Sequence, residues 1–348
     1  MQVVLGVLLA LTAGTINGLF AMPMKLARKW PWENVWLPFS ALAMVVFPCV
    51  VAIQSTPDLA AGYREVEPSS FVFAVLCGIV AYAGSLMFGI SIPLIGNALA
   101  FALLVGSMSM VGVLGPILLF HSEALGLGGG KWILCGVMVL LTALIVCGRA
   151  GILKGRKQTD GARPGEAADS GSRNIRGMTL AVAGGVLSGL LPLGMSMGWA
   201  GNIAEAVIRS GGAGQAAAQN AVLLPILLGG ALPNCGYAAY LLSRNRTWQL
   251  YRGSRAYWLI FLLMALMYSG SVALWGMSTA GNMLGRLGPS VGWALFVGGI
   301  VVSSNLGGIL TGEWKGAGGK PLGLMILGVG LMVSAMALIG YGNFLLNA

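Results

Sequence analysis

The fold is decided by residues 68–120, which read PSSFVFAVLCGIVAYAGSLMFGISIPLIGNALAFALLVGSMSMVGVLGPILLF and contain no Asp, Glu, Lys or Arg. A helix needs about 20 mostly apolar residues to cross the hydrocarbon core of a bilayer, so this stretch is long enough for two spans. Proline and glycine disfavour continuation of a helix, and the sequence PLIGN at 93–97 marks the break. We predict two membrane-spanning helices here, over 70–90 and 98–120.

The composition extends this interpretation to the whole chain. Of 348 residues, 57% are hydrophobic and 9% are charged, whereas soluble proteins carry roughly 25% charged residues. The mean hydropathy of +0.85 disfavours water-soluble enzymes, nucleic-acid-binding proteins and disordered proteins. The net charge of +10 does not imply a nucleic-acid partner, because the basic residues lie between apolar stretches. We therefore predict an all-α integral membrane protein embedded in the lipid bilayer.

Ten apolar stretches are long enough to span a membrane. They cover residues 3–24, 36–54, 70–90, 98–120, 131–148, 177–199, 219–243, 256–276, 289–311 and 321–341. A polar stretch in the middle predicts a first five-helix half at 1–148, a cytoplasmic basic linker loop at 149–174 and a second five-helix half at 175–348. Because five is odd, the second half enters the membrane inverted, an arrangement common in transporters. The inversion follows from the number of helices alone, since no sequence repeat between the halves is evident.

The basic residues indicate the orientation. Cytoplasmic loops of membrane proteins carry an excess of Lys and Arg. Of the 20 Lys and Arg residues, 16 lie in loops that follow odd-numbered helices. Those that follow even-numbered helices are Arg64, Lys131, Arg209 and Arg286. We therefore predict a multi-pass protein whose odd loops are cytoplasmic and whose two termini are both extracytoplasmic.

Residues for catalysis or metal binding are scarce. His121 is the one histidine, and the five cysteines lie scattered in apolar segments without a CxxC pair, which disfavours a metal site. No P-loop, HExxH or paired-carboxylate motif occurs. We therefore expect no enzyme activity, no metal and no cofactor, with a membrane-embedded enzyme as the less favoured alternative.

Uncharged polar and aromatic residues inside the spans are the candidates for substrate binding. An amide buried in hydrocarbon is costly unless it is hydrogen-bonded or faces a wet cavity. Two interpretations stay open, namely hydrogen bonds between helices and a path for a polyhydroxylated solute that needs neutral donors and acceptors. The absence of charge at mid-membrane depth favours a small neutral solute such as a sugar. The candidate substrate-binding residues are Asn17, Phe20, Ser85, Asn97, Asn220, Asn234 and Asn305.

Three GxxxG spacings place glycines on one face of a helix, at residues 14–18, 185–189 and 308–312. This spacing lets helix backbones approach closely in lipid. It serves ordinary helix packing or, alternatively, gives smooth faces along which helices slide during transport.

Three segments resemble one known family. Residues 20–36, FAMPMKLARKWPWENVW, resemble the end of the first helix and the first cytoplasmic loop of the bacterial L-rhamnose–proton symporter family, within the drug/metabolite transporter superfamily. Residues 149–157, RAGILKGRK, and 313–321, EWKGAGGKP, are similar to the family after the fifth helix and before the tenth. The resemblance covers essentially the whole chain and is weak between these segments.

The resemblance implies proton-driven import of a neutral deoxyhexose, with L-rhamnose as the first candidate, across the bacterial inner (plasma) membrane by alternating access. It implies the proton gradient as the driving force and no cofactor. The chain departs from one member of the family at residues 89–97, GISIPLIGN, where that member carries an arginine near an aromatic-rich stretch and this sequence has no charge. A different solute or another coupling device therefore stays open, as does another drug/metabolite-type carrier that exports or facilitates a different solute.

A symporter needs a group that gains and loses a proton during transport, normally a carboxylate or a histidine reachable from both sides. No predicted span has a central carboxylate, so the candidates lie near helix ends. On the outer side they are His121, Glu123 and Glu205, and an unperturbed histidine titrates at about pH 6.5. On the cytoplasmic side they are Glu33 and Glu313. The alternative for each residue is a solvated loop charge without a coupling role.

Overall fold

The computed structural model describes residues 2–27, 30–95, 97–159, 170–196, 198–252, 255–280, 283–312, 314 and 318–347. Within these ranges the chain is helical and forms no strand, which confirms the predicted all-α class. The helices are α1 (Gln2–Leu19), α2 (Trp32–Ala41), α3 (Phe47–Ser55), α4 (Leu59–Arg64), α5 (Pro68–Ile95), α6 (Asn97–Phe120), α7 (Gly128–Thr159), α8 (Ser170–Ser188), α9 (Leu190–Ser196), α10 (Gly198–Arg209), α11 (Gln215–Asn245), α12 (Arg255–Ser278), α13 (Gly288–Leu310) and α14 (Gly319–Asn347). Short 3-10 turns, η1 (Met22–Leu26) and η4 (Trp248–Arg252), follow α1 and α11.

Nine helical segments of the described chain are long and apolar enough to cross a membrane. A further apolar stretch, Leu103–Leu119 in α6, is shorter. Large apolar side chains such as Ile145 and Leu259 are exposed on the outside of the bundle, as expected of a surface that faces lipid. The chain is therefore a multi-pass membrane protein, as predicted.

Prolines and glycines shape the spans. The break predicted at 93–97 lies where expected, because α5 continues through Pro93 and α6 begins two residues after α5 ends. The second predicted span is divided into α2 and α3 by a π-helical turn at Leu42–Val46, between Pro38 and Pro48. π-turns inside helices are frequent at functional sites, and this one lies next to the candidate site described below.

Two features differ from the sequence-based boundaries. α7 continues to Thr159 and α8 begins at Ser170, so helix extends into both ends of residues 149–174. α10 lies where a loop was expected between the sixth and seventh spans. It buries Ile203 and Val207, and with 12 residues it is too short to cross the membrane.

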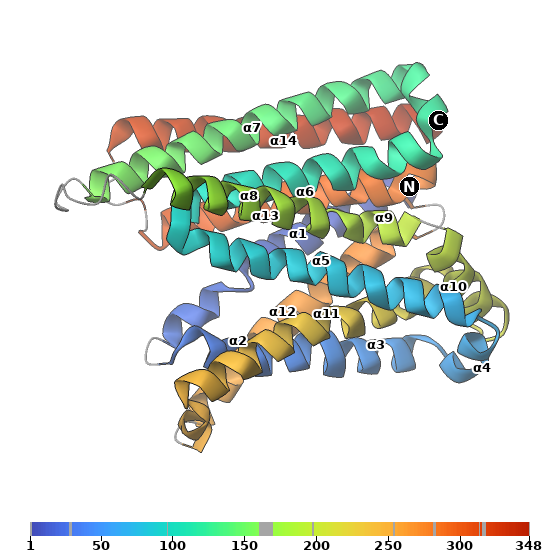
Figure 1. The fold of residues 1–348 in the computed structure, drawn as a ribbon. Coiled ribbons are helices and arrows are strands. Elements are labelled where there is room, and N and C mark those ends of the chain that lie inside the picture. The colour runs from blue at the N-terminus through green and yellow to red at the C-terminus, as the bar shows by residue number, and fades with distance from the viewer. Residues whose placement is uncertain are drawn as a thin grey trace.

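The helices lie roughly side by side in one bundle (Figure 1). α7 and α14 pack along one another at one edge, and α2, α3, α11 and α12 lie at the opposite edge. The two chain ends lie near each other at the end of the bundle that also carries α4 and α10; we call this the termini end. α1 packs against α12, and α11 packs against both α2 and α5, which brings five helices around one group of aromatic side chains.

Candidate functional site

Five aromatic side chains from α2, α5, α12 and the end of α1 form what we call the aromatic cluster: Phe20, Trp36, Phe39, Tyr82 and Tyr268. The Phe20 and Phe39 rings stack with their centroids 5.4 Å apart, and Tyr268 lies edge-on to them at 5.3 and 5.6 Å. Trp36 packs 5.0 Å from Phe39. The hydroxyl oxygens of Tyr82 and Tyr268 are 2.6 Å apart, a short hydrogen bond. Rings and one hydrogen bond therefore join helices of both predicted halves.

Neutral hydrogen-bonding groups adjoin the aromatic cluster. The Asn17 side-chain amide donates to the Ser271 hydroxyl at 2.7 Å and joins α1 to α12. The Trp36 indole N–H donates to Asn234 Oδ1 at 2.9 Å and joins α2 to α11, and the fully buried Asn234 donates in turn to the Gly230 carbonyl oxygen at 3.1 Å. Flat apolar rings beside uncharged donors and acceptors are typical of sites for neutral polar ligands.

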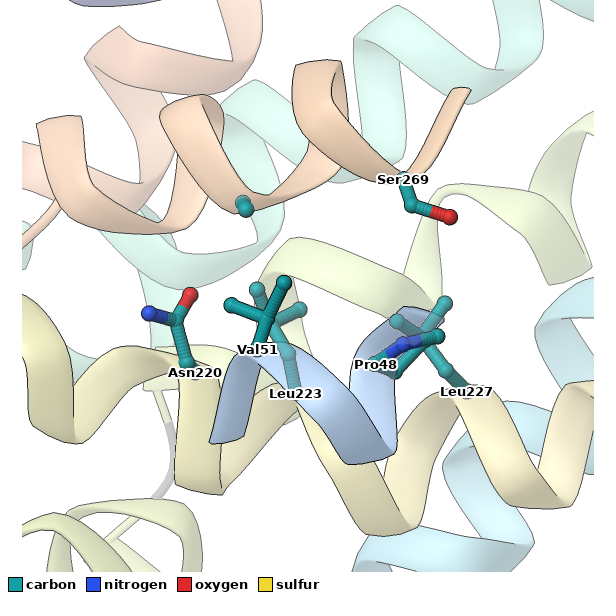
Figure 2. A pocket seen from close by; sticks show the side chains of 7 residues that line it. Pro48, Val51, Asn220, Leu223, Leu227 and Ser269 are labelled. Carbon is teal, nitrogen blue, oxygen red and sulfur yellow. The ribbon is translucent and has the colours of Figure 1, made fainter. Parts of the chain in front are cut away.

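A small cavity lies beside Ser269, the residue after Tyr268 (Figure 2). It is lined by Pro48, Val51, Asn220, Leu223, Leu227, Ser269 and Ala273. Its volume of about 10 Å³ suits roughly one water molecule and is far smaller than a sugar. Asn220 Oδ1 has no hydrogen-bond partner in the described part of the chain, whereas the Ser269 hydroxyl donates to the Ala43 carbonyl oxygen at 2.8 Å. Asn220 therefore keeps a free acceptor near this cavity.

Contacts tie the helices together at the termini end. Arg209 on α10 donates two hydrogen bonds to Glu65 Oε2, at 2.8 and 3.1 Å. Hydrogen bonds from Ser210 and Arg209 lower the pKa of the exposed Glu65 carboxyl. The Tyr63 hydroxyl donates to the Ala221 carbonyl oxygen at 2.7 Å, and burial raises the pKa of this phenol. The segment around α4 is thus bonded to both α10 and α11.

A second group of contacts lies where α2 begins and α11 ends. Trp30 packs edge-on to Tyr251 with ring centroids 5.3 Å apart. The Tyr251 hydroxyl donates to the Asn34 carbonyl oxygen at 3.1 Å, and burial, with the nearby Glu33 charge adding to it, raises the pKa of Tyr251 to about 12. The Asn245 amide donates to Glu33 Oε1 at 2.6 Å. The aromatic cluster therefore lies between two sets of contacts, one at each end of the bundle.

The predicted proton-coupling residues occupy different environments. His121 Nδ1 lies 3.8 Å from Glu123 Oε1 in the turn after α6, with side chains 31% and 69% exposed. Glu205 is exposed on α10, whereas Glu33 is 6% exposed. Glu313 lies outside the described residues. Of the predicted set, the structure thus brings only His121 and Glu123 close to one another among the described residues.

The remaining predicted binding residues are occupied locally. The Ser85 hydroxyl donates to the Tyr82 carbonyl oxygen at 2.7 Å, and the Asn305 amide donates to the Val301 carbonyl oxygen at 2.7 Å, in each case within one helix. The side chain of Asn97 lies outside the described residues. Asn17, Phe20 and Asn234 are therefore the predicted binding residues that the structure gathers at the aromatic cluster.

The candidate binding residues chosen from the sequence include one member of the aromatic cluster, Phe20, and omit the other four, Trp36, Phe39, Tyr82 and Tyr268. Trp36 and Phe39 lie on α2 and Tyr268 on α12, and nothing in their spacing separates them from aromatic residues that anchor helices at the membrane surface. Trp36 could have been selected, because it is the last residue of the family-like segment 20–36.

Comparisons with known proteins agree with this fold. A family model described as L-rhamnose-proton symport protein matches residues 1–344. The L-rhamnose-proton symporter of Cronobacter sakazakii is 25% identical over 352 residues, and that of Salmonella paratyphi B is 26% identical over 361 residues; each match covers 98% of both chains. One solved crystal structure superposes with a TM-score of 0.54 at 16% identity over 96% of each chain, and shows a shared fold. A match of this extent decides the question of family: the chain belongs to the L-rhamnose-proton symport proteins, a family of transporters rather than enzymes.

Proposed function

We propose that this chain is a symporter that imports L-rhamnose together with protons across the bacterial inner membrane, by alternating access between two inverted halves. The observation that carries the proposal is the family match over residues 1–344, together with relatives named L-rhamnose-proton symporter that align over 98% of both chains. The partners are thus a neutral sugar, protons and the lipid bilayer. The proton gradient drives accumulation, and no cofactor takes part.

The chemistry of the aromatic cluster supports a neutral sugar. Within the described part of the chain, Asp, Glu, Lys and Arg lie near helix ends or outside the spans, so the middle of the bundle offers no fixed charge to an ionic substrate. L-rhamnose carries a methyl group and hydroxyls on one ring. Aromatic faces pack against the apolar side of such a ring, and amides and hydroxyls satisfy its polar edge. We assign substrate contact to Phe20 and Asn234, with Asn17 holding α1 in place beside them.

Helix contacts support the two inverted halves. We count ten spans by taking α2–α3 and α8–α9 as one span each and by including α6. On this count α1 packs against α12 and α13, the eighth and ninth spans, while α8 packs against α5 and α6, the third and fourth. α7 and α14, the fifth and tenth, pack against each other. Each contact thus has a counterpart when the two halves are exchanged.

No repeat is evident from the sequence alone, but short motifs at these contacts can be aligned once the contacts have paired the helices. Residues 9–19, LALTAGTINGL, align with 180–190, LAVAGGVLSGL, and residues 101–107, FALLVGS, align with 293–299, WALFVGG. The first motif of each half contacts the second motif of the other half in the same way: residues 9–19 contact 293–299, and residues 180–190 contact 101–107. A side chain added at Gly14 would meet the Phe296 carbonyl oxygen, and one added at Gly185 would meet that of Leu104. Phe296 and Leu104 hold the same place in their motifs.

The orientation is testable by itself. The termini share one end of the bundle, and the uneven distribution of Lys and Arg assigns this end to the outside. Alkaline phosphatase fused after Ala348 is therefore expected to be active, and the same reporter inserted at residues 160–169 is expected to be inactive. The opposite pattern would refute the predicted orientation and the cytoplasmic linker.

The function is tested by uptake of labelled L-rhamnose into proteoliposomes with an acidic exterior. We expect accumulation that a protonophore abolishes, and alkalinisation outside when sugar is added. L-fucose and D-glucose report on selectivity. Downhill flux that ignores the pH gradient would indicate a facilitator, and accumulation driven by an acidic lumen would indicate an exporter. Either result would contradict the proposal.

Proton coupling is assigned to the outer side, to at least one of His121, Glu123 and Glu205. His121 Nδ1 and Glu123 Oε1 lie 3.8 Å apart in the turn after α6. His121→Ala, Glu123→Gln and Glu205→Gln are made separately and assayed for accumulation and for sugar exchange without a gradient. We expect at least one variant to lose accumulation while keeping exchange. If all three variants accumulate sugar with an unchanged pH profile, the outer-side assignment is wrong. Glu33 and Glu313, the two candidates on the cytoplasmic side, are then tested in the same way.

A further inference from the structure

α5 and α12 carry matching four-residue motifs of the form Tyr-x-Gly-Ser. Tyr82-Ala-Gly-Ser85 lies in the middle of α5, and Tyr268-Ser-Gly-Ser271 lies in the middle of α12. Each serine hydroxyl donates to the carbonyl oxygen of the tyrosine in its own motif, at 2.7 and 2.6 Å. The two motifs therefore share sequence and local hydrogen bonding, and they occupy the third and eighth spans, which are counterparts in the two halves.

The two tyrosines touch each other through their hydroxyls, at 2.6 Å. Two equivalent groups that are exchanged by a two-fold rotation can be in contact only if they lie at the rotation axis. Tyr82 and Tyr268 therefore mark the approximate axis that relates the halves. Because each lies near the middle of its helix, the contact falls near the centre of the membrane.

The surroundings of this contact suit a deoxyhexose. A phenol both donates and accepts a hydrogen bond, so two phenols facing one another can receive the hydroxyls of a sugar placed between them. Phe20, which is partly exposed, lies edge-on to Tyr268 and supplies an apolar ring for the methyl group of the sugar, while the buried Phe39 packs behind Phe20. Tyr82 is 8% exposed, and a hydrogen bond made away from water is worth more than one at the surface.

We propose that the sugar is bound on this axis, between Tyr82 and Tyr268, and that the two hydroxyls exchange their mutual hydrogen bond for bonds to the sugar. The proposal rests on the proposed function for the identity of the sugar. A site on the axis presents the same pair of phenols to a solute arriving from either side of the membrane. The Tyr82–Tyr268 bond then closes the path when no sugar is bound.

Tyr82→Phe and Tyr268→Phe test the proposal, because each removes one hydroxyl and keeps the ring. L-rhamnose binding to purified protein is measured at equilibrium, together with the apparent melting temperature. Each phenol both donates to and accepts from the sugar, so each variant loses two sugar hydrogen bonds, while the free protein loses the one mutual bond that the sugar would have displaced. The net loss of about one hydrogen bond raises Kd by about three- to ten-fold, and we expect a rise of this size in both variants. Tyr341→Phe on α14, which is half exposed, is the control and is expected to keep the wild-type Kd.

The proposal is overturned if both variants fold and bind L-rhamnose with the wild-type Kd, whether or not their melting temperatures fall. The tyrosine pair would then be a packing contact only. The two variants are independent tests, so one that fails to fold leaves the other to decide. Sugar binding by wild-type protein without proton-driven uptake would refute the proposed symport and leave the tyrosine site standing. Absence of L-rhamnose binding to wild-type protein would refute both.

Discussion

Gly14→Ala and Gly185→Ala test the matched packing of the two halves most directly. Gly14 lies against α13, and an added Cβ would come within 3.0 Å of Gly299 Cα as well as meeting the Phe296 carbonyl oxygen. Gly185 lies against α6, where an added Cβ would meet the Leu104 carbonyl oxygen and approach Ser107 Cβ to 2.7 Å. Backbone atoms cannot swing away as a flexible side chain does, so each pair of helices has to separate.

Overpacking of this kind typically costs about 1–3 kcal/mol. At roughly 2 °C per kcal/mol for a chain of this size, we expect each variant to lower the apparent melting temperature by about 2–6 °C. The measurement is a thermal ramp on detergent-solubilised protein, followed by size-exclusion chromatography. Gly106→Ala on α6 is the control, because an added Cβ there meets nothing within 4 Å; it is expected to melt at or above the wild-type temperature, since alanine favours helix over glycine.

A melting temperature for both variants that equals that of Gly106→Ala would refute the close approach of α1 to α13 and of α8 to α6. A loss in only one variant would instead contradict the matched packing of the two halves, because the reasoning requires the same contact to occur twice.

Three further outcomes follow from single contacts. Trp36→Phe leaves the buried Asn234 Oδ1 without its indole donor, so we expect the free energy of unfolding to fall by about 1–3 kcal/mol and the melting temperature to fall with it. An unchanged melting temperature would show that this hydrogen bond does not stabilise the fold. The pKa of Glu65 is lowered in the folded protein, so its bond to Arg209 contributes at neutral pH and is lost as pH falls through that lowered pKa. Wild type and Glu65→Gln are thus expected to differ in melting temperature at pH 7 and to converge in acid, and a gap that widens in acid would contradict the sign. Burial raises the pKa of Tyr251 to about 12, so this phenol is expected to keep its proton at pH 10. The measurement is an ultraviolet pH titration of wild type and of Tyr251→Phe, whose difference gives the titration of Tyr251 alone. Loss of the proton at the ordinary pKa of a tyrosine would contradict the burial of this side chain.

The membrane-spanning helices and the break between α5 and α6 could be predicted from the sequence. Crossing a bilayer requires long apolar runs, and the break at 93–97 follows from proline and glycine chemistry. Asn17 and Asn234 were identifiable because an amide inside an apolar run needs a partner. Their partners, Ser271 and Trp36, were not identifiable, since pairing between distant helices leaves no trace in local spacing.

The proposed repeat between the halves illustrates a second limit of prediction from sequence. Short shared motifs such as Tyr82-Ala-Gly-Ser85 and Tyr268-Ser-Gly-Ser271 are common by chance in a chain with 55 glycines. They acquire meaning only when their residues are seen in contact, as the two tyrosine hydroxyls are. Phe39 could not be assigned to the site from the sequence either. The sequence around an aromatic residue on a membrane helix is the same whether its side chain faces lipid, protein or substrate.

If the two halves are inverted copies as proposed, the matched glycine contacts of α1 and α8 affect how the carrier divides its time between the two sides of the membrane. In a molecule built from two inverted copies, the inward-facing state is the outward-facing state with the roles of the copies exchanged. Contacts present in both copies contribute equally to the two states, so they cancel from the free-energy difference between them. The resting preference for one side is then set by positions where the copies differ, such as Asn17 and its counterpart Ser188. Substitutions at these few positions would re-bias the carrier and leave its helix frame unaltered.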